Sequence, residues 1–249
     1  MNELLPIASS VAVATAGVVA YGAVNAQAQL FGETVYQTNS PRRLAITFDD
    51  GPNPSLTPKL LNLLEKYDAK ATFFLIGRFA RECPDLVRDT ASRGHLIGNH
   101  TETHPNLFWL SPSAIKEELH QCTGVLGEIL GAQPKWFRPP YGFRNPWVVP
   151  TAKQLSMRTL MWTLLPGDWK PRPLETLIRN IHPIANRAEQ NRAQARGTGD
   201  VLCLHDGGHR GLNADRNNTL KALEHWLPRW RDLSLEFVTI DEAVRAPAP

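Results

Sequence analysis

Cysteine is scarce in this sequence of 249 residues, which contains only Cys83, Cys122 and Cys203. No two of them form a CxxC pair, and an odd number leaves at least one outside any pairing scheme. This spacing excludes a disulfide framework and argues against a zinc site built from thiolates. We expect the cysteines to serve as small buried apolar residues.

Blocks of basic residues are also missing. The formal net charge is +3, and the lysines and arginines form no cluster or stripe, so no nucleic-acid partner is expected. No internal repeat or low-complexity segment stands out. The length and the hydrophobic content of 42% are typical of one globular domain with a sizeable core.

The N-terminal segment lacks charge. The 21 residues from Leu4 to Val24 carry none, and such a stretch can span a bilayer or direct export. Ala26-Gln27-Ala28 has the small residues of a cleavage site, but the usual preceding basic residues are absent, since Glu3 is the only charge there. We expect residues 1–30 to be a signal peptide or a membrane anchor, which would make the protein secreted or membrane-anchored. A buried apolar helix is the alternative.

A polar linker, residues 31–41, is expected ahead of the main domain, residues 42–245. Arg42 and Arg43 lie on the far side of the uncharged stretch. Under the positive-inside rule they favour the membrane orientation opposite to the one that export of the main domain requires, although they lie near the distance limit of that rule.

Beyond the linker, short apolar runs alternate with longer amphipathic ones. The expected strands are Leu44–Phe48, Ala71–Ile76, His95–Gly98, Lys135–Arg138, Arg158–Leu164, Val201–Leu204 and Leu235–Ile240. The expected helices are Thr57–Lys66, Phe79–Ser92, Ser113–Leu130, Pro146–Leu155, Leu174–Arg192 and Asp215–Trp230. Seven β/α units predict an α/β fold with a parallel sheet and right-handed crossovers. A closed or partly open barrel and an open doubly wound sheet both fit this rhythm.

Polar residues follow the ends of five expected strands. They are Asp49 and Asp50, His100 and His104, Arg138 with Tyr141, Asp168, and His205. The carboxyl ends of parallel strands share one face of a β/α fold, where catalytic residues collect. These residues are therefore expected to form one site.

Asp49 and Asp50 stand in the stretch FDDGPNP. An Asp-Gly turn followed by a helix start would explain one aspartate. Two adjacent carboxylates repel each other, so they need a cation or a proton to coexist.

His100 and His104 are four residues apart in GNHTETHPN, which would place both imidazoles on one face of a helical turn. Pro105 favours a single turn or a loop here, and two solvated loop histidines are the alternative. Together with a carboxylate from another strand end, the two histidines would form a divalent-metal site that leaves positions open for water and substrate.

Arg138 precedes a Pro-Pro turn in FRPPYGFR. Its guanidinium could clamp a carboxylate, and the turn could aim a backbone N–H at an oxyanion; a stiffened loop with a surface arginine is the alternative. His205 ends an apolar strand in which Cys203 shares its face, although a core or turn histidine would look the same.

Five motifs in this order, TFDDG, HTETH, RPPYG, the Asp-Trp of GDWKP and LHDGG, resemble those of polysaccharide deacetylases of the NodB-homology type, carbohydrate esterase family 4. The resemblance extends from about Arg42 to Val244. It implies a distorted (β/α)7 barrel and metal-dependent hydrolysis of acetyl groups on N-acetylated sugars, or on O-acetylated xylan in some members.

The resemblance also implies a role for each matching residue. Asp50, His100 and His104 would bind the metal, usually zinc, while Asp49 would be the catalytic base and His205 the catalytic acid.

Five further residues would complete the site. Arg138 would orient the base, Asp168 would tune the acid–base network, and the Tyr141 N–H would join the oxyanion hole. Trp169 would line the substrate groove. Cys203 stands where the family commonly has a leucine against the acetyl methyl group, which implies a roomier acetyl pocket.

The expected activity is that of an amide hydrolase acting on chitin oligomers or peptidoglycan. An O-acetyl xylan esterase, a hydrolase of small cyclic amides or imides, and an inactive glycan-binding protein are the alternatives. We expect a monomer, with membrane attachment through residues 4–24. Four tryptophans that could stack on sugar rings, some of them core residues instead, are Trp109, Trp136, Trp147 and Trp169.

Overall fold

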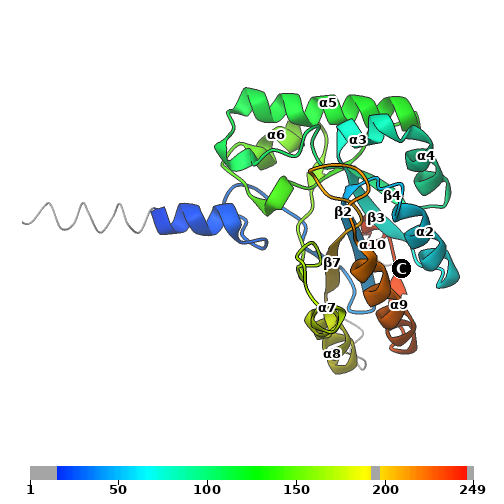
Figure 1. The fold of residues 1–249 in the computed structure, drawn as a ribbon. Coiled ribbons are helices and arrows are strands. Elements are labelled where there is room, and N and C mark those ends of the chain that lie inside the picture. The colour runs from blue at the N-terminus through cyan, green and yellow to red at the C-terminus, as the bar shows by residue number, and fades with distance from the viewer. Residues whose placement is uncertain (1–15, 192–196, 246–249) are drawn as a thin grey trace, which may run out of the picture.

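The computed structural model of the chain describes residues 16–191 and 197–245 (Figure 1). The first half of the expected signal peptide or anchor therefore lies outside the described residues. Residues 16–24 form a helix that projects away from the main body (Figure 1). Among the helices that lie within the described ranges, none has the length and apolar character needed to cross a membrane.

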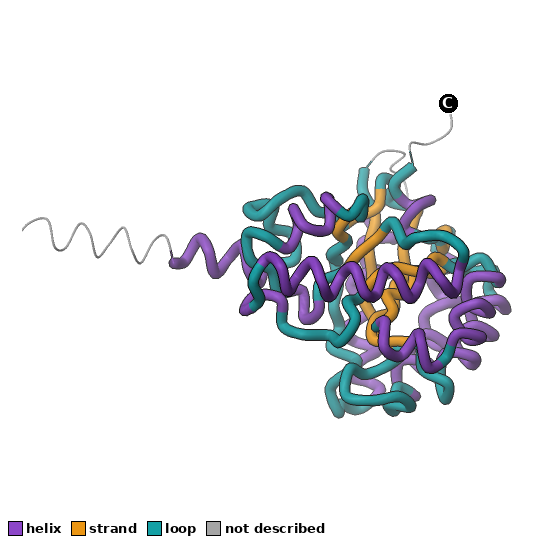
Figure 2. Tube along the Cα trace, turned by 90° about the horizontal axis from the view of Figure 1, so that it is seen from above, coloured by secondary structure: helices purple, strands orange, loops and turns teal. Residues whose placement is uncertain are grey.

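A central sheet contains the strands, and the helices surround it (Figure 2). The sheet order is β1-β7-β2-β3-β4-β5-β6, and β8 pairs separately with β2. Among the strand pairings of the described residues, β1–β7 is antiparallel and the others are parallel. The strands are β1 (Gln37–Thr38), β2 (Arg43–Gly51), β3 (Ala71–Leu75), β4 (Leu96–Asn99), β5 (Trp136–Phe137), β6 (Arg158–Thr159), β7 (Gly199–His205) and β8 (Glu236–Phe237).

The strand order distinguishes a barrel from a doubly wound sheet. Strands β2 to β6 follow chain order without the reversal that a doubly wound sheet requires. Between β6 and β7 the sheet is connected only loosely, through a bridge between Leu164 and Leu202. Val35 bridges Leu160 in the same gap, while β1 pairs with β7. The expected distorted (β/α)7 barrel is confirmed, and residues of the expected linker contribute to it.

The helices lie close to their expected positions. They are α2 (Thr57–Lys66), α3 (Gly77–Glu82), α4 (Pro84–Ser92), α5 (Pro112–Leu130), α6 (Val148–Gln154), α7 (Leu174–Ile181), α8 (Pro183–Gln190), α9 (Asn217–Asp232) and α10 (Ile240–Ala243). Two helices expected as continuous are divided at Pro84 and Pro183, because proline lacks the N–H that would continue a helix but fits its first turn. Residues 240–243, of which Ile240 was expected to end a strand, form α10 instead.

The central strand β2 places the two aspartates. Leu44, Ile46 and Phe48 belong to the main hydrophobic core, where Phe48 stacks on Phe73 with ring centroids 4.9 Å apart. Ala45 and Thr47, which point to the opposite face, are also fully buried, and burial on both faces is typical of a central parallel strand. Asp49 and Asp50 follow directly, so the packing of β2 fixes both carboxylates at the carboxyl edge of the sheet.

The cysteines carry no disulfide. Cys122 and Cys203 are buried, as expected, whereas Cys83 is only half-buried at the junction of α3 and α4.

Candidate active site

A cavity of about 880 Å³ opens at the carboxyl edge of the sheet. Eight of the ten expected site residues line it, namely Asp49, Asp50, His100, His104, Tyr141, Trp169, Cys203 and His205. The other two, Arg138 and Asp168, are buried behind them. The structure therefore brings residues from five separate stretches of sequence into one site.

Asp50, His100 and His104 form a buried triad of potential metal ligands. One ligand atom from each lies within 4.8 Å of the others. The Oδ1 of Asp50 is 3.1 Å from the Nε2 of His104 and 3.5 Å from the Nε2 of His100. Burial raises the pKa of Asp50, but the two histidines lower it, and the result is a pKa well below the usual value.

Two observations test whether the triad fits a metal ion. His100 Nδ1 lies 2.8 Å from the carbonyl oxygen of Arg138, so it donates there and leaves Nε2 free as a ligand. Asp50 Oδ1 is buried and faces the two imidazole Nε2 atoms, yet within the described residues no contact with it has the geometry of a hydrogen bond. A buried carboxylate oxygen without a donor is costly unless a cation satisfies it. The donor set therefore fits a divalent ion.

Four of the eight non-glycine residues with positive φ in the described part of the chain lie at this edge. Asp50, Thr101, His104 and Tyr141 all have left-handed conformations, with φ between 58° and 70°. Non-glycine residues rarely take such values, and they cluster at functional sites where the surrounding structure enforces them.

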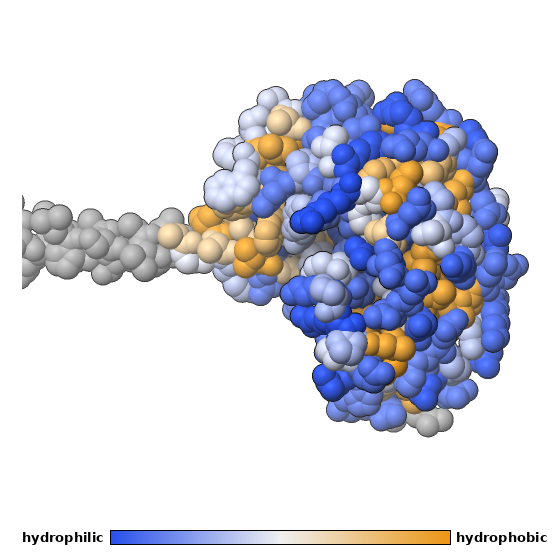
Figure 3. Space-filling view, viewed as in Figure 1, coloured by the Kyte–Doolittle hydropathy of each residue, from blue (hydrophilic) through white to orange (hydrophobic). Residues whose placement is uncertain are grey.

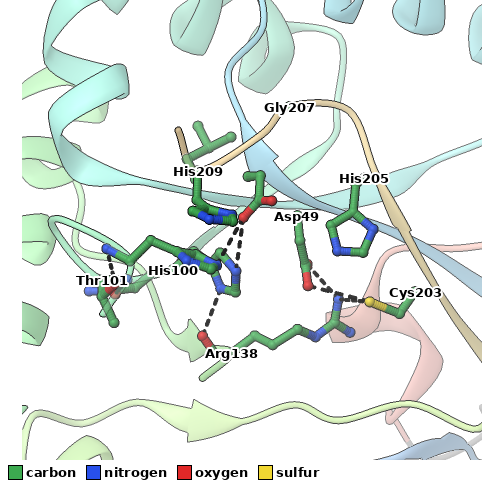
Figure 4. Close-up of polar contacts among 12 residues, drawn as sticks. Asp49, His100, Thr101, Arg138, Cys203, His205, Gly207 and His209 are labelled. Carbon is green, nitrogen blue, oxygen red and sulfur yellow. Dashed lines mark hydrogen bonds and ion pairs between the residues drawn. The ribbon is translucent and has the colours of Figure 1, made fainter. Parts of the chain in front are cut away.

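Asp49 is held by two donors, one on each carboxylate oxygen (Figure 4). Arg138 donates to Oδ1 at 2.7 Å, and the Cys203 thiol donates to Oδ2 at 3.3 Å. Burial raises the pKa of Asp49, but the charge and hydrogen bond of Arg138 help to hold it below its usual value. Asp49 is thus an oriented anion beside the triad.

Arg138 is completely buried and links both sides of the site. Its guanidinium also donates to the Thr47 hydroxyl at 2.7 Å and to the carbonyl oxygens of Leu160 and Met161. Its own carbonyl oxygen accepts the hydrogen bond from His100. One residue therefore orients both a potential metal ligand and the candidate base, and the alternative of a surface arginine is wrong.

His205 is the residue of β7 that pairs with Asp49 of β2, and it lies next to Asp168. Its Nδ1 lies 2.9 Å from Asp168 Oδ1, and its backbone N–H donates to Oδ2 at 2.8 Å. The Thr219 hydroxyl donates to the same Oδ2. Burial lowers the pKa of His205, but the charge and hydrogen bond of Asp168, together with the charges of Asp50 and Asp49, outweigh it and raise the pKa to about 9. His205 is therefore protonated at neutral pH.

Replacing Asp168 by asparagine is expected to move the alkaline limit of activity to lower pH. If protonated His205 is required, activity is present below its pKa of about 9 and is lost as the pH rises through that value. Asparagine removes the opposite charge, so the limit falls by roughly 1–3 pH units. A pH–rate profile measures it. The control Thr219→Val keeps the charge and should retain the limit near pH 9; equal profiles for the two variants would contradict the assignment.

Sequence reasoning missed several residues of the site, and three of them contact its predicted polar residues. The His209 ring stacks on that of His104, with centroids 4.8 Å apart, and its position four residues after His205 was the available signal. Thr47 and Thr219 contact Arg138 and Asp168. An isolated threonine gives no sequence signal for such a contact.

Gly207 permits the close approach of β7 and β2 beyond His205. A β-carbon at this position would overlap the carbonyl group of Asp50. We expect Gly207→Ala to lower the free energy of unfolding by about 1–3 kcal/mol. The melting temperature should fall by about 2–4 °C for each kcal/mol that is lost, as thermal denaturation would measure. Gly211→Ala, where a β-carbon meets open space, is the matched control; equal melting temperatures would refute this reading.

The four tryptophans considered for sugar stacking lie in different environments. Trp136 is fully buried and donates to Asp241, so it is a core residue. Trp169 lines the cavity, with its ring centroid 4.9 Å from that of His205. Trp109 and Trp147 are exposed and do not line the cavity.

The family model for polysaccharide deacetylases matches residues 36–160. A peptidoglycan-N-acetylglucosamine deacetylase of Bacillus cereus is 37% identical over 208 residues, covering 83% of this chain and 90% of that protein. A chitooligosaccharide deacetylase of Azorhizobium caulinodans is 32% identical over 206 residues, covering 80% and 93%.

A solved structure of a related protein has the same fold. The crystal structure of the Bc1960 peptidoglycan N-acetylglucosamine deacetylase superposes with a TM-score of 0.73 at 28% identity, covering 86% of this chain and 94% of that one. Together with the matching family model and relatives, this similarity confirms the resemblance and the expected class of hydrolase. The chain belongs to the polysaccharide deacetylase family.

Proposed function

We propose that this protein hydrolyses the N-acetyl groups of N-acetylglucosamine residues in peptidoglycan or in chemically related chitin oligomers. One observation carries the proposal: the triad of potential metal ligands shares a single cavity with an oriented carboxylate and a protonated histidine. The names of the relatives at 37% and 32% identity support these two substrates.

Asp50, His100 and His104 would hold the metal. Two imidazole nitrogens and one carboxylate oxygen, with positions left open, suit zinc, which is the ion we propose. A divalent ion there would supply Lewis-acid chemistry, polarising the acetyl carbonyl and making a water molecule more acidic.

The protein's own groups would move the protons. Asp49, held by Arg138 and Cys203, would accept a proton from the attacking water. His205, kept protonated by Asp168, would give its proton to the departing amine as the C–N bond breaks. The products are acetate and a free amine, so atoms and charges balance.

One backbone N–H and two side chains would contact the substrate. The Tyr141 N–H, in a backbone turn with φ of 58°, is the proposed oxyanion donor. Trp169 would offer a ring face to the substrate beside His205. Cys203 would border the acetyl methyl group and leave more room than a leucine.

Acetate release tests the proposal. Purified peptidoglycan, chitin oligomers and acetylated xylan are incubated with the protein, with and without a chelator. We expect release from the first two substrates, loss with chelator and recovery with added zinc. Release from xylan alone would favour the esterase, and no release from any substrate would favour an inactive glycan-binding protein.

A further inference from the structure

A buried arginine lies outside the catalytic machinery. Arg144 ends the motif FRPPYGFR, and only 1% of its surface is exposed. Its guanidinium donates to the backbone carbonyl oxygens of Gly22, Asn25 and Ala28. Its backbone N–H also donates to the carbonyl oxygen of Ala23, at 3.1 Å. Burial lowers the pKa of Arg144 to about 10.

These four carbonyl groups belong to the end of the projecting helix, residues 16–24, and to the turn that follows it. The last carbonyl groups of a helix lack intrahelical partners and favour a nearby cation. Arg144 therefore fastens the N-terminal segment to the catalytic domain. Ala23 and Ala28 are buried in the same contact.

This contact indicates whether the N-terminal segment is cleaved off or retained. Cleavage after Ala26-Gln27-Ala28 would remove all the carbonyl oxygens that Arg144 contacts, and a buried cation without acceptors is strongly unfavourable. The small residues that resemble a cleavage site are instead part of the folded domain. The structure thus favours retention of the segment.

The surface around this junction is apolar and aromatic. Val24 is 59% exposed, and the described part of the projecting helix is coloured as hydrophobic in Figure 3. Trp109 and Trp147 are 78% and 50% exposed. Asn145, the neighbour of Arg144, donates to the carbonyl oxygens of Leu107, Phe108 and Leu110 and so ties the turn that carries Trp109 to this junction.

Exposed tryptophans beside an uncharged segment are typical of a protein surface at the membrane–water interface. Tryptophan is enriched where a membrane meets water. The 21 uncharged residues from Leu4 to Val24 have the length of a membrane-spanning segment, about 20 residues. We propose that this segment is retained as a membrane anchor and that residues 16–30, Trp109 and Trp147 form an anchor face that contacts lipid.

The state of the mature N-terminus tests retention. The full chain is produced in a bacterial host, and its intact mass and membrane fractionation are measured. We expect a mass that includes residues 4–28, sedimentation with membranes after washing with high salt and carbonate, and release by detergent. A soluble mature chain that begins at Gln29 would overturn the proposal.

Fluorescence quenching tests the anchor face. The purified full chain is reconstituted into phosphatidylethanolamine–phosphatidylglycerol vesicles with brominated acyl chains. Bromine quenches tryptophans at the lipid, so we expect quenching that is largely lost in the double variant Trp109→Phe/Trp147→Phe. Trp169→Phe, a change inside the cavity, should leave the quenching in place. Quenching that is absent, or unaltered in the double variant, would refute lipid contact.

Protease sensitivity tests the role of Arg144. With the full chain in detergent, Arg144→Met should expose residues 25–28 to an added protease and raise the cleavage rate there severalfold. Lys153→Met, which removes an exposed cation from α6, should not change it. Equal cleavage rates in both variants would mean that Arg144 does not hold the segment.

Discussion

Replacing His100 by alanine is expected to remove the metal and, with it, the activity. The variant leaves only Asp50 and His104 in the triad. Removing an outer partner of a metal ligand already weakens binding by about 10–100-fold, so loss of a ligand should weaken it by at least about 100-fold. Elemental analysis of the purified protein measures the metal, and acetate release measures the activity.

His120→Ala is the matched control, because His120 is an exposed histidine on α5, away from the cavity. It should retain full metal content and turnover. A His100→Ala protein that keeps one ion per chain would contradict the proposed ligand set.

Replacing His205 by alanine should separate metal binding from proton transfer. His205 lies outside the triad, so the metal content should stay unchanged. Removing the proton donor to the departing amine should lower kcat by roughly 10²–10⁴-fold. The loss should be smaller for a substrate whose leaving group needs no proton, such as an activated aryl acetate ester.

Two outcomes would oppose this assignment. A His205→Ala protein that loses its metal would make His205 a ligand, and one with normal turnover would remove it from the mechanism. Because the same two measurements are made on His100→Ala, the pair of variants distinguishes ligand from acid directly.

Much of the fold follows from the spacing of apolar residues. A strand occurs at each of the seven expected runs, which are bounded by turn residues, although β5, β6 and β8 are only two residues long and so shorter than expected. Pro84 was a visible signal for the division of the helix expected at Phe79–Ser92, which was nevertheless expected to be continuous. The short helix α10 had no such signal, since Ile240 continues an apolar run. The two-residue β1 is too short for any periodic signal, and only its pairing with β7 defines it.

The site was predictable to the extent that its motifs follow strand ends. The positions of Asp49 and His205 follow from β2 and β7, which pair residue against residue. The second donor on Asp49, the Cys203 thiol, depends on side-chain packing that no spacing encodes. Arg144 is a similar case, because its partners are backbone carbonyl oxygens more than a hundred residues earlier in the chain.

The pairing of β2 with β7 has a consequence for biosynthesis. Cys203 and Asp49 are separated by 154 residues in sequence, and β8, which also pairs with β2, lies still later. Contacts between such distant segments form slowly, and only after both have been synthesised. A nascent chain therefore carries Asp49, Asp50 and the two histidines of the triad well before it has His205, the proposed proton donor. Hydrolytic competence is acquired only in the last stage of folding.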